Sequence, residues 1–115
     1  MKLPKEAELL RIFIGESDRR GARLLYEVIV EEARRQGLAG ATVLQGTMSF
    51  GANSRLHTTK VLRLSEDLPT IIEIVDSTEK IDAFIPFLDD VIQEGLVTRE
   101  RANVIFYRHG SPPEH

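Results

Sequence analysis

Residues 37–51 read G-L-A-G-A-T-V-L-Q-G-T-M-S-F-G, and four of the chain's eight glycines fall within these positions. Glycine is used where the backbone takes a positive φ or passes close to another group, and it costs conformational entropy elsewhere. The run from about Ala41 to Met48 is apolar and typical of a strand. We therefore predict that Gly37 ends a helix, that a strand follows, and that a functional loop begins near Ser49.

A strand and a helix are predicted before this stretch. Apolar and β-branched residues are dense from Leu9 to Ile14, with Arg11 interrupting one face, and this pattern favours a first strand. Ser17 or Asp18 is then a candidate helix cap, because apolar residues recur at helical spacing from there to the glycine at position 37. The first part of the chain therefore has the order strand, helix, strand.

The next segment is predicted to form a loop and a third strand. Residues 49–57 are too many for a tight hairpin and poor in core-forming side chains, so they predict a projecting, mobile loop. A third strand is expected from about Thr58 through Leu64. Leu68-Pro69 interrupts it, and we interpret residues 70–75 as its continuation after a bulge.

A second helix and a last strand complete the predicted elements. Residues 76–79, D-S-T-E, have the spacing of a capping box, and an apolar stripe follows them up to Gly95. Pro86 removes one backbone hydrogen bond inside this helix, so we expect a kink or a tight first turn and not two helices. Residues 103–107, N-V-I-F-Y, are typical of a strand.

The predicted order β-α-β-β-α-β indicates a ferredoxin-like α+β fold, in which right-handed crossovers place both helices on one face of an antiparallel sheet. Two helices cannot cover the second face. The first strand nevertheless carries apolar residues at both parities, with Leu9 and Phe13 on one side and Leu10 and Ile12 on the other. We therefore expect a partner subunit to pack there and predict an oligomer.

Length and composition favour one small domain. The 115 residues, of which 42% are hydrophobic, predict a single domain over residues 1–110 and a disordered tail over 111–115. The N-terminus lacks the apolar stretch of a signal peptide, and no run is long enough to span a bilayer, so we expect a cytoplasmic protein. The absence of cysteine excludes thiolate catalysis and sulfur-held zinc. A net charge of −3 argues against binding of nucleic acid.

The sequence resembles the PII-like signalling superfamily, in particular its small branch of uncharacterised proteins. The matching stretches are, in chain order, residues 37–43, 49–51, 68–69, 72–75, 95 and 104–106. The resemblance implies a homotrimer of ferredoxin-like subunits, an adenine nucleotide in each cleft between neighbours, and a loop after the second strand that reports occupancy to a partner.

Two departures from nitrogen-regulatory PII proteins are visible. The loop at 49–57 is shorter and lacks the tyrosine that those proteins modify, so their partners are not implied here. Residues 96–102, L-V-T-R-E-R-A, replace the glycine-rich phosphate turn that ends in lysine. Phosphates would then be held by arginine, and the ligands to consider are AMP, ADP, ATP and a cyclic dinucleotide.

The candidate nucleotide site combines loop-base glycines, arginines and a carboxylate within a strand. Free backbone N–H groups at a loop base hold phosphate in other proteins, and guanidinium groups suit bidentate phosphate contacts. The predicted nucleotide-binding residues are Gly46, Ser49, Phe50, Gly51, Arg55, His57, Glu73, Val75, Thr98, Arg99, Arg101 and Arg108. The alternative for the glycines is a bulge and turn, and the alternative for the charges is an exposed surface.

Three functions remain open from the residues. We favour a non-enzymatic regulator that acts on a transporter or channel through residues 49–57, since Ser49, Ser54 and Ser65 have no paired base. The second is a metal-responsive protein with His57 and Glu73 as ligands, although we place Glu73 at a subunit seam. The third is a small nucleotide hydrolase. The favoured regulator requires no metal or other cofactor.

Overall fold

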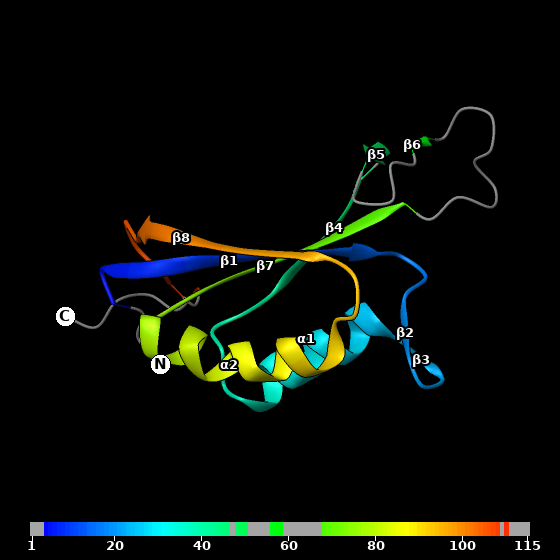
Figure 1. Cartoon of the computed structure of the whole chain (residues 1–115). Coiled ribbons are helices and arrows are strands. Elements are labelled where there is room, and N and C mark those ends of the chain that lie inside the picture. Colours follow the sequence, from blue (N-terminus) through cyan, green and yellow to red (C-terminus); the bar gives the residue numbers. More distant parts are fainter. Residues whose placement is uncertain (1–3, 47, 51–55, 59–67, 109, 111–115) are drawn as a thin grey trace.

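A four-stranded antiparallel sheet and two helices form the fold. This computed structural model describes residues 4–46, 48–50, 56–58, 68–108 and 110. The spatial strand order is β4-β7-β1-β8. The strands are β1 (Glu6–Gly15), β4 (Thr42–Gln45), β7 (Pro69–Asp76) and β8 (Leu96–Asn103), and the helices are α1 (Leu25–Arg35) and α2 (Thr78–Val91). Both helices lie on one face of the sheet (Figure 1).

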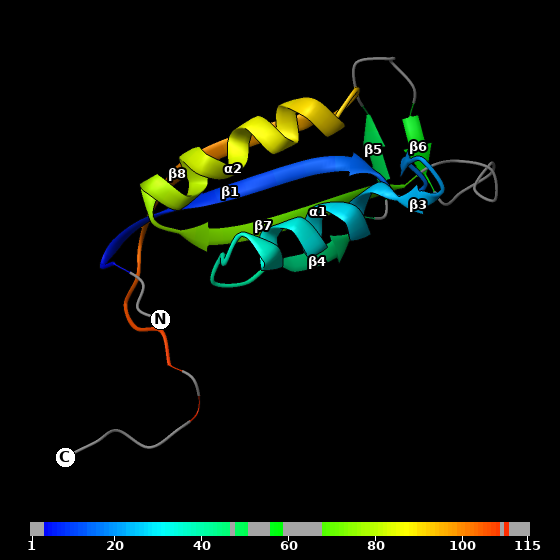
Figure 2. The same cartoon turned by 90° about the horizontal axis from the view of Figure 1, so that it is seen from below.

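The connections confirm the ferredoxin-like prediction. The units β1-α1-β4 and β7-α2-β8 interleave, because β7 lies between β1 and β4 while β1 lies between β7 and β8. Figure 2 shows α2 over β8 and β1, and α1 over β7 and β4. Two short hairpins are added, β2 (Arg19–Arg20) with β3 (Arg23–Leu24) and β5 (Met48–Phe50) with β6 (Leu56–Thr58).

The core lies between the sheet and the helices. Successive side chains of a strand point to opposite faces, so alternate residues of β1 and β7 face the helices. These residues are at most 4% exposed and are Leu10, Ile12, Ile14, Ile72 and Ile74. The helices bury Ile29 and Phe84 completely against them. One apolar face of the sheet is therefore covered by the helices, and the other face is not.

Helix α1 begins later than predicted. Neither Ser17 nor Asp18 caps it with a side chain; the preceding residue is Leu24, and the Leu25 N–H donates to the carbonyl of Asp18. The intervening residues form the β2-β3 hairpin, which turns at Gly21 with a φ of 64°. The glycine at position 21, in the predicted first turn of the helix, was the available signal for this hairpin.

The predicted end of α1 at Gly37 is confirmed. Gly37 has a φ of 80°, its N–H donates to Arg34 O, and the Leu38 N–H donates to Ala33 O. This pair of bonds is a Schellman motif, which satisfies the last carbonyls of a helix through a left-handed residue. Leu38 is buried and completes the apolar contact of the motif. The first glycine of the opening stretch therefore has a structural role.

Helix α2 begins one residue later than the capping box predicts. Its N-cap is Ser77, whose Oγ accepts a hydrogen bond from the Lys80 N–H. Asp76 is instead 3% exposed, and its carboxylate accepts bonds from the N–H groups of Ser77 and Ala39, each at 2.7 Å. Pro86 lies inside one continuous helix, as expected. Asp76 thus ties the start of α2 to the turn between α1 and β4.

The last strand was predicted too late in the chain, at residues 103–107, because the observed strand starts at Leu96. Strand β8 is Leu96–Asn103, and residues 104–107 belong to no strand. Because β8 lies at an edge of the sheet, its side chains are mostly exposed and its sequence is polar. The apolar residues Ile105, Phe106 and Tyr107 are exposed outside the sheet, so apolar composition misplaced the strand.

The second strand is shorter than predicted. Strand β4 ends at Gln45, and β5 starts separately at Met48. The flanks of the predicted loop pair as β5 and β6, so residues 49–50 and 56–57 are strand and not loop. Residues 51–55 and most of the predicted third strand lie outside the described residues, as does the bulge proposed before β7. The tail at 111–115 also lies outside them.

Candidate functional site

The helix-free face of the sheet carries a polar row across all four strands. Thr42 of β4 lies opposite Glu73 of β7, Glu73 lies opposite Arg11 of β1, and Arg11 lies opposite Thr98 of β8. Each residue has the parity opposite to the buried core residues, so all four point away from the helices. The row therefore runs across the sheet from one edge strand to the other.

An ion cluster crosses three strands on this face. Arg11 Nε donates to Glu73 Oε2 at 2.8 Å, and Arg11 Nη1 donates to Glu100 Oε1 at 3.0 Å. The bond to Glu73 is the main cause that raises the pKa of Arg11 above its already high ordinary value. The side chains of Arg11 and Glu73 are only 37% and 31% exposed. Glu73 therefore faces the uncovered side of the sheet, with a paired charge.

A parallel apolar row lies beside the polar one. Leu44, Ile71, Phe13 and Leu96 face one another in register across β4, β7, β1 and β8. Leu44 is 43% exposed and Leu96 is 57% exposed, while Phe13 and Ile71 are half-buried. Apolar side chains aligned across an uncovered sheet face are typical of a surface that another molecule covers. Together the two rows define the open face of this protein.

The base of the segment 49–57 lies at one end of β4 and β7 (Figure 1). The backbone N–H of Gly46 is not a free donor, because it bonds to Pro69 O at 2.8 Å. A Cβ at Gly46 would lie 2.5 Å from Pro69 Cγ, which explains this glycine by close packing. Ser49 pairs with His57 in the β5-β6 ladder, and Phe50 pairs with Leu56.

The predicted arginines differ in their surroundings. Arg99 is held by Glu8 Oε1 at 2.6 Å and Asp82 Oδ1 at 2.8 Å, on the helix side of β8. The two hydrogen bonds that Arg99 donates, first the one to Asp82 and then the one to Glu8, raise its pKa. Arg101 shares that side, as predicted, and makes no hydrogen bond or ion pair to any residue that the structure describes. Arg108 is beyond β8, with its guanidinium 4.2 Å from the centroid of the Phe106 ring.

Residues 7–104 match the model of the family named DUF190 and described as "Uncharacterized ACR". The chain belongs to this family. A UPF0166 protein of Aquifex aeolicus is 33% identical to it over 99 residues, which cover 86% of this chain and 93% of that protein.

Two solved structures show the same fold as this DUF190 chain. One is a putative PII-like signaling protein from Thermus thermophilus, with a TM-score of 0.61, 23% identity, and coverage of 87% of this chain and 90% of that one. The other is CPII, a nitrogen regulatory PII-like protein from Thiomonas intermedia bound to ADP, AMP and bicarbonate. Its TM-score is 0.59 at 16% identity, with coverage of 86% and 88%. At these identities the likeness establishes the PII-like fold alone.

The DUF190 chain brings together some of the predicted site residues and separates others. Glu73, Val75 and Thr98 share the open face, whereas Arg99 and Arg101 lie on the helix side of the edge strand β8. Gly51 and Arg55 lie outside the described residues. Arg108 does not end a strand, and it lies on the segment that follows β8.

Three open-face residues of the DUF190 chain were missed. Arg11 pairs with both Glu73 and Glu100, and Thr42 lies opposite Glu73 in register. A charged residue in the middle of each of two apolar strands was the available signal, because Arg11 and Glu73 each interrupt a run of apolar residues. Their pairing depends on strand register, which the sequence does not give.

Two further features of the chain bear on metal binding and on insertion into a membrane. Over the described ranges, no three His, Asp or Glu residues gather as a metal site would require. Glu73, one of the two metal ligands considered, is paired with Arg11. No helix in the described part of the DUF190 chain has the length and apolar character to cross a bilayer.

Proposed function

We propose that this chain is a cytoplasmic, non-enzymatic regulator that binds an adenine nucleotide in the clefts between the copies of a homotrimer. Segment 49–57 would report occupancy of the site to a partner, as other segments do that order on binding a ligand. A membrane transporter or channel is the partner class to test first. No resident cofactor is required, since AMP, ADP, ATP or a cyclic dinucleotide is the ligand itself.

The open face is the observation that carries this proposal. It is a sheet face with an aligned apolar row and a half-buried ion cluster, and neither of the two described helices covers it. A second copy of the chain would remove the apolar row from water, which is the main driving force of association. One of the structural neighbours with the same fold is described as bound to ADP and AMP. This description supports an adenine nucleotide as the first ligand to test.

The phosphates would be bound by Arg101. Arg99 is already held by two carboxylates, whereas Arg101 is exposed and makes no ion pair among the described residues. Because β8 is an edge strand, both of its faces adjoin any copy that packs along that edge. Thr98, with Glu73 and Val75, would then line the seam from the open face. The remaining predicted contacts come from Gly46, Ser49, Phe50, Gly51, Arg55, His57, Arg99 and Arg108.

Calorimetric titration tests this proposal with AMP, ADP, ATP and a cyclic dinucleotide in turn. We expect one of them to bind, and we expect Arg101→Gln to weaken that binding about tenfold or more, since a hydrogen bond to a charged group is worth about 1.5–3 kcal/mol. Arg19→Gln is the matched control. Arg19 is also exposed, but its guanidinium donates to Ala22 O within the β2-β3 hairpin.

Results that contradict the proposal are equally specific. If none of the four nucleotides gives a heat of binding, the proposed nucleotide ligand is excluded. Tight binding of a divalent metal that His57→Ala abolishes would support the metal-responsive alternative. Release of phosphate from ATP or ADP by the wild-type protein, abolished in Arg101→Gln, would make the protein an enzyme.

A further inference from the structure

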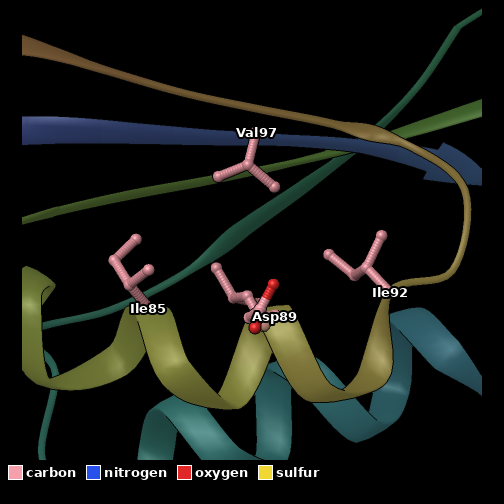
Figure 3. Close-up of a pocket in the computed structure, with 5 residues that line it drawn as sticks. Ile85, Asp89, Ile92 and Val97 are labelled. Carbon is pink, nitrogen blue, oxygen red and sulfur yellow. The ribbon is translucent and has the colours of Figure 1, made fainter.

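An apolar groove lies between α2 and the edge strand β8, on the opposite face of the sheet from the open face. Its volume is about 200 Å³, and it is lined by Ile85, Leu88, Asp89, Ile92 and Val97. Figure 3 shows that Ile85 and Asp89 of α2, and Ile92 just after its end, project toward Val97 of β8. Asp89 is exposed and makes no hydrogen bond or ion pair within the described part of the chain. The groove is thus apolar with one unpaired carboxylate.

The segment after β8, residues 104–108, exposes large apolar side chains, and we call it the arm. Ile105 is 85% exposed and Phe106 is 65% exposed, the two highest values among the large apolar residues of the described ranges. The Arg108 guanidinium lies over the Phe106 ring at 4.2 Å and has no carboxylate partner in the parts of the chain described. The arm therefore presents an aromatic ring and a cation side by side.

The arm is held in place at both ends. The Val104 N–H donates to Lys5 O at 2.8 Å, and the Tyr107 hydroxyl donates to Ala39 O at 3.2 Å. The two exposed apolar residues lie between these anchors, so they project from a positioned segment. A positioned segment loses less conformational entropy on binding than a free tail.

We infer that the arm of one copy docks in the α2-β8 groove of a second copy, with Phe106 in the groove and Arg108 against Asp89. A dry cavity of about 150 Å³ lined by aliphatic side chains can hold benzene, so a groove of this size suits a phenyl ring. The unpaired cation of the arm matches the unpaired carboxylate of the groove, which fixes orientation. Both surfaces are apolar, and their charges are complementary.

The occupant is a second copy and not the same chain. The arm starts at the end of β8 and Val97 lies near its beginning, so about 20 Å of strand separates them at roughly 3.3 Å per residue. The bond from Tyr107 to Ala39 also holds the arm at the turn between α1 and β4. Figure 2 shows the segment after β8 turning away from the sheet.

This contact joins two different surfaces, so it is head-to-tail and generates a closed ring or a filament. That the ring closes with three copies rests on the proposed function. The arm contact names the residues through which those copies would meet. It does not depend on the nucleotide.

Cross-linking tests the contact, because the chain has no cysteine of its own. Chains with Asp89→Cys and chains with Arg108→Cys are refolded together and oxidised without nucleotide. We expect covalent pairs that contain one of each chain, since a disulfide needs Cα atoms within about 7 Å. Glu79→Cys, exposed in the first turn of α2, is the control, and mixed with Arg108→Cys it should give no pairs.

Phe106→Ala supplies the second measurement. The ring is mostly exposed in the single chain, so the variant should keep its circular dichroism and lose the mass of the assembly. Absence of 89–108 pairs, or an unchanged assembly mass for Phe106→Ala, would overturn the arm contact. If pairs form but no nucleotide binds, the contact stands and the proposed function fails. If a trimer binds nucleotide but forms no pairs, the contact fails and the proposed function stands.

Discussion

Replacement of Asp76 by alanine tests the contact that holds the glycine-rich turn against the start of α2. The carboxylate is 3% exposed and accepts two bonds of 2.7 Å, from the N–H groups of Ala39 and Ser77. A hydrogen bond to a charged group contributes about 1.5–3 kcal/mol, and removal leaves buried donors without an acceptor. Because both bonds end on one carboxylate, we expect a loss of about 3 kcal/mol in the free energy of unfolding and not the full sum.

The assay is urea unfolding followed by circular dichroism, at a fixed protein concentration because assembly also contributes to stability. A loss of this size should lower Tm by about 10 °C in a domain of this length. Asp76→Asn retains one acceptor and should lose about half as much. Asp90→Ala is the control, since its carboxylate is 71% exposed and pairs with Arg20 at 3.3 Å, and it should change the free energy by about 0.5 kcal/mol or less. If Asp76→Ala is no less stable than Asp90→Ala, the reasoning about this buried carboxylate is refuted.

Two further predictions concern a close approach and a surface ion pair. A Cβ at Gly95 would lie 2.6 Å from Phe13 O, so Gly95→Ala should lower the free energy of unfolding by about 1–3 kcal/mol. A Cβ at Gly40 would have no atom within 4 Å, so Gly40→Ala should not lower it. Equal stability of the two variants in urea would contradict this prediction. Hydrogen bonds from Arg23 lower the pKa of Glu31 below its ordinary 4.5. A carboxyl with a depressed folded-state pKa stabilises the fold above its unfolded pKa and loses that effect as pH falls. The Tm difference between wild type and Arg23→Gln should therefore be present at neutral pH and shrink below pH 4.5, and a difference that grows in acid would contradict the assignment.

The parts of the fold that could be predicted are those that bury one face. Alternation in β1 places Leu10 and Ile12 in the core, and the apolar stripe of α1 ends at Gly37 as its sequence indicates. These signals are strong because burial against the sheet selects the residue type at each turn or alternate position.

The parts that could not be predicted are those where a strand is polar and exposed, or where apolar residues lie outside the sheet. Strand β8 is an edge strand with a polar sequence, and the apolar arm after it lies outside the sheet. Apolar composition therefore predicted a strand at the arm and none at β8. The predicted site was divided for a related reason. Arg11 and Glu73 are 62 residues apart in sequence and meet only through the register of β1 with β7, which a single sequence does not reveal.

Native mass spectrometry with added adenine nucleotide tests the central claim most directly, because one spectrum counts both the chains and the ligands in a particle. The account predicts a particle of about 39 kDa, three times the 13.0 kDa of the chain, that carries up to three nucleotides and releases them when it dissociates into single chains. A single chain that retains nucleotide, or three chains that bind none, would contradict it.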